Sequence, residues 1–127
     1  MQLHTGKQII VVGDKVLVEP AKDEDRSPHG LYLPPTVKEK EKVQGGYVVQ
    51  VGQGLPVVNP GYIDQEPWST TPKEPVKYIP LQSREGDYAI FLRDQAIEIE
   101  FERKKYLIVP HSALLIIIRS GHPEDVA

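Results

Sequence analysis

The chain lacks cysteine and lacks any long hydrophobic run, and each absence excludes a class of protein. Without cysteine there can be no disulfide framework, thiolate metal site or cysteine nucleophile. The longest apolar run, residues 113–118, is too short to span a bilayer. Residues 1–7 do not have the basic patch and apolar segment of an export signal. We therefore expect a cytoplasmic protein with no membrane partner.

The chain also lacks an excess of positive charge. The formal net charge is −3 and the sequence pI is about 5.8, and Lys and Arg do not gather along any one stretch. Nucleic-acid-binding surfaces usually need a basic patch, so a nucleic-acid partner is not expected. The length of 127 residues fits one domain, residues 1–127, with room for one modest core.

The apolar residues that are present fall into short clusters rich in Val, Ile and Tyr, separated by Gly, Pro or charged residues. This pattern is typical of short β-strands, and no helix of ordinary length is predicted. The sequence therefore predicts an all-β fold. The expected strands are residues 8–12, 15–19, 46–51, 88–92, 96–101, 105–109 and 114–119.

The clearest strand signal is an alternation with a period of two at residues 97–102. It should place apolar side chains on one face and carboxylates on the other. Residues 97–109 then read as a hairpin, whose turn type stays open because the turn contains no glycine. The alternating residues are Ile97, Ile99 and Phe101 with Glu98, Glu100 and Glu102.

Residues 20–45 interrupt the strand pattern. Only Leu31, Tyr32 and Leu33 are consecutive apolar residues, and they lie between a Pro-Gly-flanked charged stretch and Pro34-Pro35. Three apolar residues cannot offset the conformational entropy that the whole segment would lose on ordering. We therefore expect a mobile loop. The apolar triplet has two interpretations: it docks in the groove of a partner, or it folds back on its own domain as a small staple.

Residues 55–85 form a second long excursion, which holds six of the twelve prolines and the only tryptophan. Connections this long are usually functional, and the prolines make a simple hairpin doubtful. The aromatic residues Tyr62, Trp68 and Tyr78 either pin the insert to the domain as a satellite cluster or face a partner.

The sequence does not contain the residue patterns that a metal, acid/base or nucleotide site needs. His4, His29, His111 and His122 lie in unrelated segments without metal-ligand spacing. The three glutamates of residues 98–102 are better explained by a solvated strand face than by acid/base chemistry. Gly52-Gln53-Gly54 lacks the remainder of a dinucleotide fingerprint. We predict no catalytic residue, no metal and no cofactor.

Five sequence segments, in the order in which they occur along the chain, resemble those of the chaperonin-10 (GroES) family. They are GDKVLVEP at 13–20, HGLYLPP at 29–35, KEKEKVQGGYVVQVGQG at 38–54, EGDYAIF at 85–91 and KYLIVPHSALLII at 105–117. The resemblance implies a GroES-like, partly open β-barrel and a non-enzymatic co-chaperonin. Such a protein caps chaperonin-60 as a seven-membered ring and assists ATP-dependent folding, and the partner binds the nucleotide.

The family pattern also implies site residues. Gly30, Leu31, Tyr32 and Leu33 match the segment of the mobile loop that docks on chaperonin-60. The family's ring pairs the first strand of one subunit with the last strand of its neighbour. This would join Ile9, Ile10 and Val11 to Leu115, Ile116 and Ile117 of the next chain. The alternative is that both strands are buried within one subunit.

Two departures from the family pattern concern the roof and the docking tripeptide. The Pro-rich insert at residues 55–85 is longer than the family's usual roof hairpin, and Tyr32 is bulkier than the family's common Val. An alternative function is a GroES-like binding module whose aromatic insert takes a peptide or single-stranded nucleic acid. The acidic balance disfavours the nucleic acid.

Overall fold

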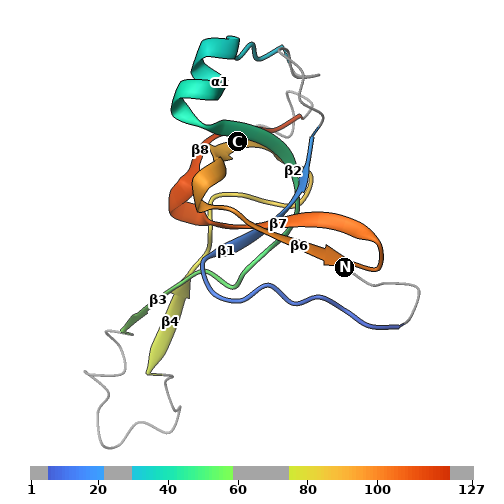
Figure 1. The fold of residues 1–127 in the computed structure, drawn as a ribbon. Coiled ribbons are helices and arrows are strands. Elements are labelled where there is room, and N and C mark those ends of the chain that lie inside the picture. The colour runs from blue at the N-terminus through green and yellow to red at the C-terminus, as the bar shows by residue number, and fades with distance from the viewer. Residues whose placement is uncertain (1–5, 22–29, 59–74, 121–127) are drawn as a thin grey trace, which may run out of the picture.

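The computed structural model describes residues 6–21, 30–58 and 75–120, and these residues are mostly β-structure (Figure 1). Short β-strands form because the apolar clusters are brief, β-branched and bounded by Gly or Pro. The strands are β1 (Lys15–Pro20), β2 (Val43–Val51), β3 (Leu55–Val58), β4 (Val76–Ile79), β5 (Tyr88–Leu92), β6 (Ile97–Phe101), β7 (Lys104–Pro110) and β8 (Leu114–Ile118). One short helix, α1 (Pro35–Glu41), and two 3₁₀ turns, Arg93–Gln95 and His111–Ala113, complete the described elements.

Six strands form one antiparallel sheet in the order β6-β7-β1-β2-β5-β8. Register shifts at Leu17/Val18 and Ile90/Phe91 mark irregularities of the kind that bend strands. The sheet curls around its core but does not close, so β6 and β8 remain as edges. The expected all-β fold and open barrel are therefore confirmed.

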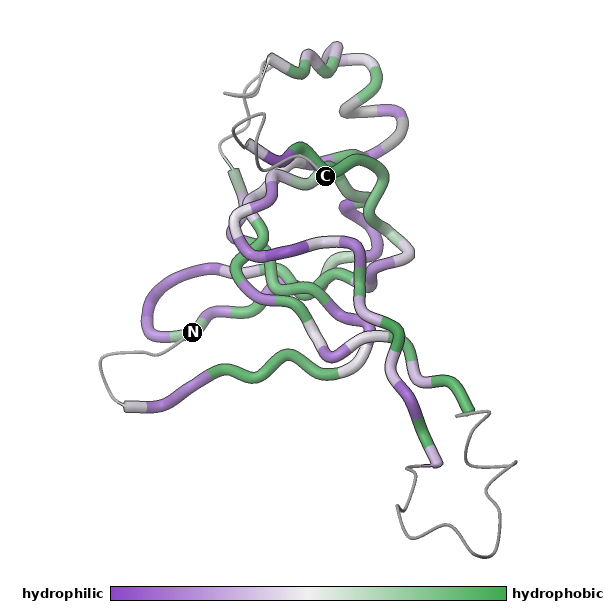
Figure 2. Tube along the Cα trace, turned by 180° about the vertical axis from the view of Figure 1, so that it is seen from behind, coloured by the Kyte–Doolittle hydropathy of each residue, from purple (hydrophilic) through white to green (hydrophobic). Residues whose placement is uncertain are grey.

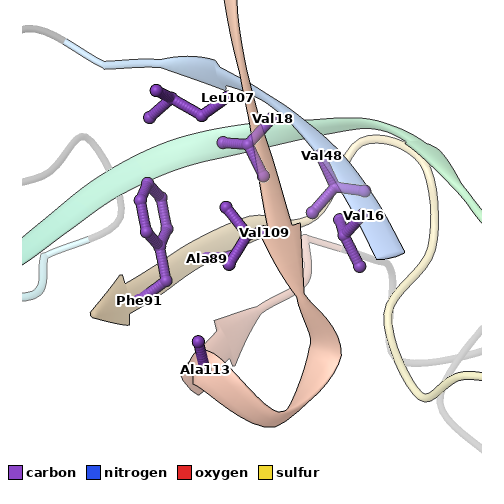
Figure 3. Close-up of a cluster of buried hydrophobic side chains, with 8 residues drawn as sticks. All are labelled: Val16, Val18, Val48, Ala89, Phe91, Leu107, Val109 and Ala113. Carbon is purple, nitrogen blue, oxygen red and sulfur yellow. The ribbon is translucent and has the colours of Figure 1, made fainter. Parts of the chain in front are cut away.

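The main core lies inside the curled sheet (Figure 3). The aromatic ring of Phe91 from β5 meets aliphatic side chains from β1, β2 and β7. Central strand β1 is buried along residues 16–18. Burial of this apolar surface is the main favourable contribution to folding. The cluster comprises Val16, Val18, Val48, Ala89, Phe91, Leu107, Val109 and Ala113.

The predicted hairpin at residues 97–109 is confirmed as β6 and β7. Its turn residues Glu102 and Arg103 both have positive φ, 50° and 68°, which is the pattern of a type I′ turn. The apolar face of β6 is only partly covered, and Ile97 is 63% exposed. It is poorly covered because β6 is an edge strand.

The prediction of a strand at residues 8–12 is wrong for the single chain. Only Gln8 makes an isolated bridge, and the rest of the segment is extended without a strand ladder. The Val11 N–H donates instead to the side-chain Oε1 of Gln50 at 2.9 Å. The hydrophobic pattern was strand-like, but a strand needs a neighbour with which to pair.

The insert also differs from expectation, because its base is a regular antiparallel hairpin of β3 and β4. Pro56 lies within the ladder, opposite Tyr78. A two-stranded ladder leaves alternate N–H groups on open edges, so it can tolerate a proline. All eight residues of the two strands are exposed, so Tyr78 does not pin the insert to the barrel. Tyr62 and Trp68 lie outside the described residues.

Helix α1 occupies part of the segment expected to be a mobile loop, and β2 begins at Val43, within the same range. Pro35 stands in the first turn, where a missing N–H is tolerated, and Lys and Glu are good helix formers. Lys42 ends the helix in a left-handed conformation. The helix has only seven residues. Residues 22–29 of the expected loop lie outside the described residues.

Candidate docking and assembly surfaces

The predicted docking residues lie between the end of β1 and the start of α1. Gly30 is exposed with φ of +84°, a conformation that favours glycine. Tyr32 is 48% exposed, whereas Leu31 and Leu33 are half-buried. Two apolar side chains of the triplet are thus partly withdrawn from water, and the third remains accessible.

Leu31 and Leu33 pack on a second hydrophobic cluster of the barrel, distinct from the main core. The buried members come from β2 and β5, and the last strand contributes Ile118. The staple interpretation of the triplet therefore describes how its two leucines lie in the isolated chain. The cluster consists of Val43, Tyr88 and Ile90, with Ala21, Leu92 and Ile118 partly buried around them.

A glycine makes room for the central aromatic ring of this cluster. A Cβ added to Gly45 would overlap the Tyr88 hydroxyl oxygen and lie 2.7 Å from its Cζ. Tyr88 also meets Tyr47 edge-to-face, with ring centroids 5.1 Å apart. Gly45 therefore lets the Tyr88 ring lie close against β2.

Residues 30–33, which we call the docking segment, lie between two backbone hydrogen bonds that hold the ends of β1 and α1. The Ala21 N–H donates to the Gly45 carbonyl at 3.1 Å, at the point where β1 ends. The Arg93 N–H donates to the Lys42 carbonyl at 2.7 Å, where α1 ends. The end of β1 is thus held by β2, and the end of α1 by the connection after β5.

The predicted ring residues of β8 lie on an open edge of the sheet. β8 pairs only with β5 among the described strands, so its other side has no partner. Leu115 is 52% exposed and Ile116 45% exposed, while Ile117 is half-buried. A long aliphatic edge of this kind is a template for pairing with another chain.

The predicted ring residues at the start of the chain are also accessible. Ile10 is 74% exposed, and Ile9 and Val11 are half-buried. Figure 2 shows this extended stretch as a continuous hydrophobic tube. It does not pair with β8 of its own chain, so the alternative that both segments are buried together in one subunit is wrong for the described residues.

An apolar groove of about 250 Å³ lies beside the N-terminal segment. Its walls come from that segment and from β1, β6 and β7, so the exposed Ile10 stands next to further unfilled apolar surface. The lining residues are Ile9, Ile10, Val11, Val12, Lys15, Val16, Leu17, Ile99 and Ile108.

An ion pair between the buried carboxylate of Asp87 and the partly exposed Arg119, which sequence reasoning missed, links the end of β8 to the start of β5. Arg119 donates from Nε and Nη2 to the two oxygens of Asp87, each at 2.8 Å, and the Arg84 N–H donates to the same carboxylate at 2.8 Å. Burial raises the pKa of Asp87, but the hydrogen bonds from Arg119 and Arg84 outweigh it and leave the pKa below its ordinary value. The available signals were the polar Gly86-Asp87 pair before a buried strand and an arginine directly after the last strand.

The Gly52-Gln53-Gly54 motif has a structural use. The Gly52 N–H donates to the Lys15 carbonyl at 2.9 Å, and the Gly54 N–H donates to the Gly13 carbonyl at 3.0 Å. A Cβ on Gly52 would overlap the Gly13 carbonyl oxygen. The two glycines therefore allow two backbone turns to pack directly on each other.

The described residues contain no group of three or more potential metal ligands. Glu98, Glu100 and Glu102 are exposed, and Glu98 pairs with Lys105 at 3.5 Å. His111 is half-buried beside β8, and the other three histidines lie outside the described residues. Within the described part of the chain, no helix is both long and apolar enough to cross a membrane.

The chain is similar in sequence to known proteins. Residues 8–64 match the model of the chaperonin 10 kDa subunit family. The co-chaperonin GroES of Halalkalibacterium halodurans is 34% identical over 84% of this chain and 95% of its own length. The co-chaperonins GroES of a Bacillus species and of Thermus thermophilus are 32% and 30% identical, each over 85% of this chain and over 96% and 89% of their own lengths. The chain therefore belongs to the chaperonin-10 family of co-chaperonins.

Proposed function

We propose that this protein caps a chaperonin-60 ring in the cytoplasm and assists ATP-dependent protein folding, without catalysing a reaction itself. Chaperonin-60 binds the nucleotide, and the capping protein supplies the docking residues Gly30, Leu31, Tyr32 and Leu33. The observation that carries the proposal is the half-exposed Tyr32 between two leucines that lie outside the main core. The three residues match the family's docking segment in sequence. An apolar triplet of this kind fits the hydrophobic groove of a partner.

The overall arrangement of the molecule supports a cap. In both Figure 1 and Figure 2, helix α1 and the docking segment lie at one end of the molecule and the β3–β4 hairpin lies at the other. A cap needs two different ends, because one end must face the partner and the other must form the roof of the cap. The Pro-rich hairpin then belongs to the roof.

The two exposed apolar segments support assembly into a seven-membered ring. We propose that residues 8–12 of one chain pair with β8 of the next, so that Ile9, Ile10 and Val11 meet Leu115, Ile116 and Ile117. This pairing would bury the apolar surface that each isolated chain leaves open. Such a head-to-tail interface closes into a ring when its rotation is suitable.

A ring turns weak docking into firm capping. Each triplet offers only three apolar side chains, but copies linked in one ring bind as a multivalent ligand. Ordering the docking segment on the partner offsets part of each contact energy, which keeps release possible.

The exposed β3–β4 hairpin favours a second candidate, a module that binds an apolar peptide through the insert. Leu55, Val58 and Ile79 are exposed on these strands. The net charge of −3 counts against nucleic acid as the ligand.

The double substitution Leu31→Ser, Leu33→Ser tests the main proposal against the second candidate. It should leave the ring intact in native mass spectrometry and should weaken nucleotide-dependent binding to chaperonin-60 by at least about 100-fold, because each loop loses two apolar anchors and the losses multiply around the ring. The matched control is Leu55→Ser, Ile79→Ser in the hairpin, which should bind chaperonin-60 normally. The reverse pattern would move the binding surface to the insert.

A further inference from the structure

Residues 8–12, which we call the N-terminal segment, are attached to the barrel by a side chain of β2. The Val11 N–H donates to Oε1 of Gln50 at 2.9 Å, across 39 positions of the chain. We propose that Gln50 is a positioning residue for ring assembly: its side-chain oxygen holds the N-terminal segment extended, ready to pair with β8 of the next chain. The inference rests on the proposed function, which gives this segment one half of each ring interface.

An irregularity in β2 directs Gln50 toward the N-terminal segment. Gln50 pairs with Leu17 of β1, but the next residue of β1, Val18, pairs with Val48, so β2 has one extra residue at this point. Residues two apart in a regular strand point to the same face, and a bulge changes this. Val48 points into the main core (Figure 3). Gln50 instead shares the face of Leu17, which lines the apolar groove beside the N-terminal segment.

The N-terminal segment has the alternating exposure of a strand, although residues 9–12 belong to no ladder. Ile9 and Val11 are half-buried, whereas Ile10 is 74% exposed and Val12 is 76% exposed. A period of two is the pattern of an extended chain with one covered face. The bond to Gln50 therefore holds the segment with Ile10 and Val12 turned outward, where a second chain can cover them.

The connection between the N-terminal segment and β1 is also fixed. The Gly13 carbonyl accepts a hydrogen bond from the Gly54 N–H at 3.0 Å. The bond between Val11 and Gln50 adds a second point of attachment, two residues earlier in the chain. Two points of attachment give the extended segment a defined direction, which one attachment at its base would not give.

Holding the segment extended reduces the cost of assembly. A segment without this attachment would lose backbone conformational entropy when it pairs with the next chain, whereas a held segment has already lost part of it. A hydrogen bond of this kind shifts an equilibrium by roughly two- to tenfold. Every interface of a head-to-tail ring contains one such segment, so the effect is repeated at each interface.

Substitution of Gln50 tests the proposal through the assembly equilibrium. Gln50→Met keeps the length of the side chain and removes the acceptor. It should raise the chain concentration at which half of the ring dissociates by about five- to tenfold in analytical ultracentrifugation. Gln50→Glu keeps an acceptor oxygen and should stay within about twofold of the wild type. Gln44→Met, near the other end of the same strand, is the matched control and should also stay within about twofold.

A second measurement reports on the hydrogen bond without the ring. In protein diluted until the ring has dissociated, amide hydrogen exchange of Val11 should be at least about threefold slower in the wild type than in Gln50→Met. Gln44→Met should exchange Val11 at the wild-type rate. Circular dichroism verifies that all three variants are folded.

Three results would overturn the proposal. The first is assembly of folded Gln50→Met at the wild-type concentration. The second is equal exchange of Val11 in Gln50→Met and the wild type. The third is an equal loss of assembly in Gln50→Met and Gln50→Glu, because the acceptor oxygen would then have no role.

The outcomes also separate this inference from the proposed function. If the wild-type ring binds chaperonin-60 and Gln50→Met assembles normally, the role of Gln50 is refuted and capping stands. If the ring weakens as expected with Gln50→Met but never binds chaperonin-60, capping fails and the role of Gln50 stands. If the wild type is a monomer at every concentration, the proposed ring and the role of Gln50 fail together.

Discussion

Asp87 is a carboxylate that is 2% exposed and is held by Arg119 and by a backbone N–H of Arg84. We predict that Asp87→Asn destabilises the fold by about 2–3 kcal/mol in urea unfolding. Breaking a fully buried pair costs about 3–5 kcal/mol, and the value here is lower because the Arg119 side chain is 43% exposed. Glu98→Gln, which breaks the exposed pair with Lys105, is the control and should change stability by less than about 0.5 kcal/mol. Equal effects of the two substitutions would contradict this role for Asp87.

The same carboxylate makes stability depend on pH. Because the pKa of Asp87 is lowered in the folded state, its contribution is fully present above the ordinary aspartate pKa. The contribution is lost as the pH falls through the lower folded pKa, where the native carboxylate takes up its proton. The stability of Asp87→Asn should therefore fall less steeply than that of the wild type in acid, measured by urea unfolding at a series of pH values.

At the scale of elements, the β6–β7 turn carries avoidable strain. Arg103 has φ of +68°, where a side chain is disfavoured and glycine is not. Arg103→Gly should raise the free energy of unfolding by about 0.5–1 kcal/mol, a gain reduced by the greater freedom of glycine in the unfolded chain. Thermal unfolding measures this, with Lys104→Gly, a strand residue, as a control that should be destabilising. A less stable Arg103→Gly variant would argue against the type I′ turn.

How far the elements could be predicted depends on where their stabilising contacts lie. The strands β1, β5 and β7 follow from local runs such as Val16-Leu17-Val18, and the β6–β7 hairpin follows from the alternation of Ile97 to Glu102. Helix α1 was missed because seven residues after Pro34 carry a weak periodic signal. The hairpin of β3 and β4 was missed because Pro56 disfavours a strand unless the ladder has open edges.

Some residues of the candidate site could likewise be predicted from the sequence, and others could not. Leu31, Tyr32 and Leu33 could be found from the sequence because they are an apolar triplet among charged and Pro/Gly residues. The second hydrophobic cluster could not, because Val43, Tyr88 and Ile118 come together only when β2, β5 and β8 are assembled. The Asp87–Arg119 pair is likewise separated by 32 positions in the chain. Contacts of this range depend on the tertiary fold.

At the scale of the whole molecule, the open edge of β8 determines the proposed assembly. We predict that Ile116→Lys abolishes ring formation in analytical ultracentrifugation while the chain stays folded, because a charge would be buried in the interface between chains. Ile116 is 45% exposed in the isolated chain, so the lysine is tolerated there. Glu100→Lys on the opposite edge strand β6 is the control and should leave the ring intact. An intact ring with Ile116→Lys would place the interface elsewhere.

The two ends of the molecule differ, and this difference relates the proposed ring to the proposed docking segment and roof. The docking segment lies at the end opposite the β3–β4 hairpin (Figures 1 and 2), so a ring of such chains would present all its docking triplets on one side. Capping is the function that uses all three features together.

Native mass spectrometry of the wild-type protein with chaperonin-60, with and without nucleotide, tests this account most directly. We predict a free ring of seven copies, and a complex in which that ring joins chaperonin-60 only when nucleotide is present. A chain that remains a monomer and never shifts the mass of chaperonin-60 would contradict the account.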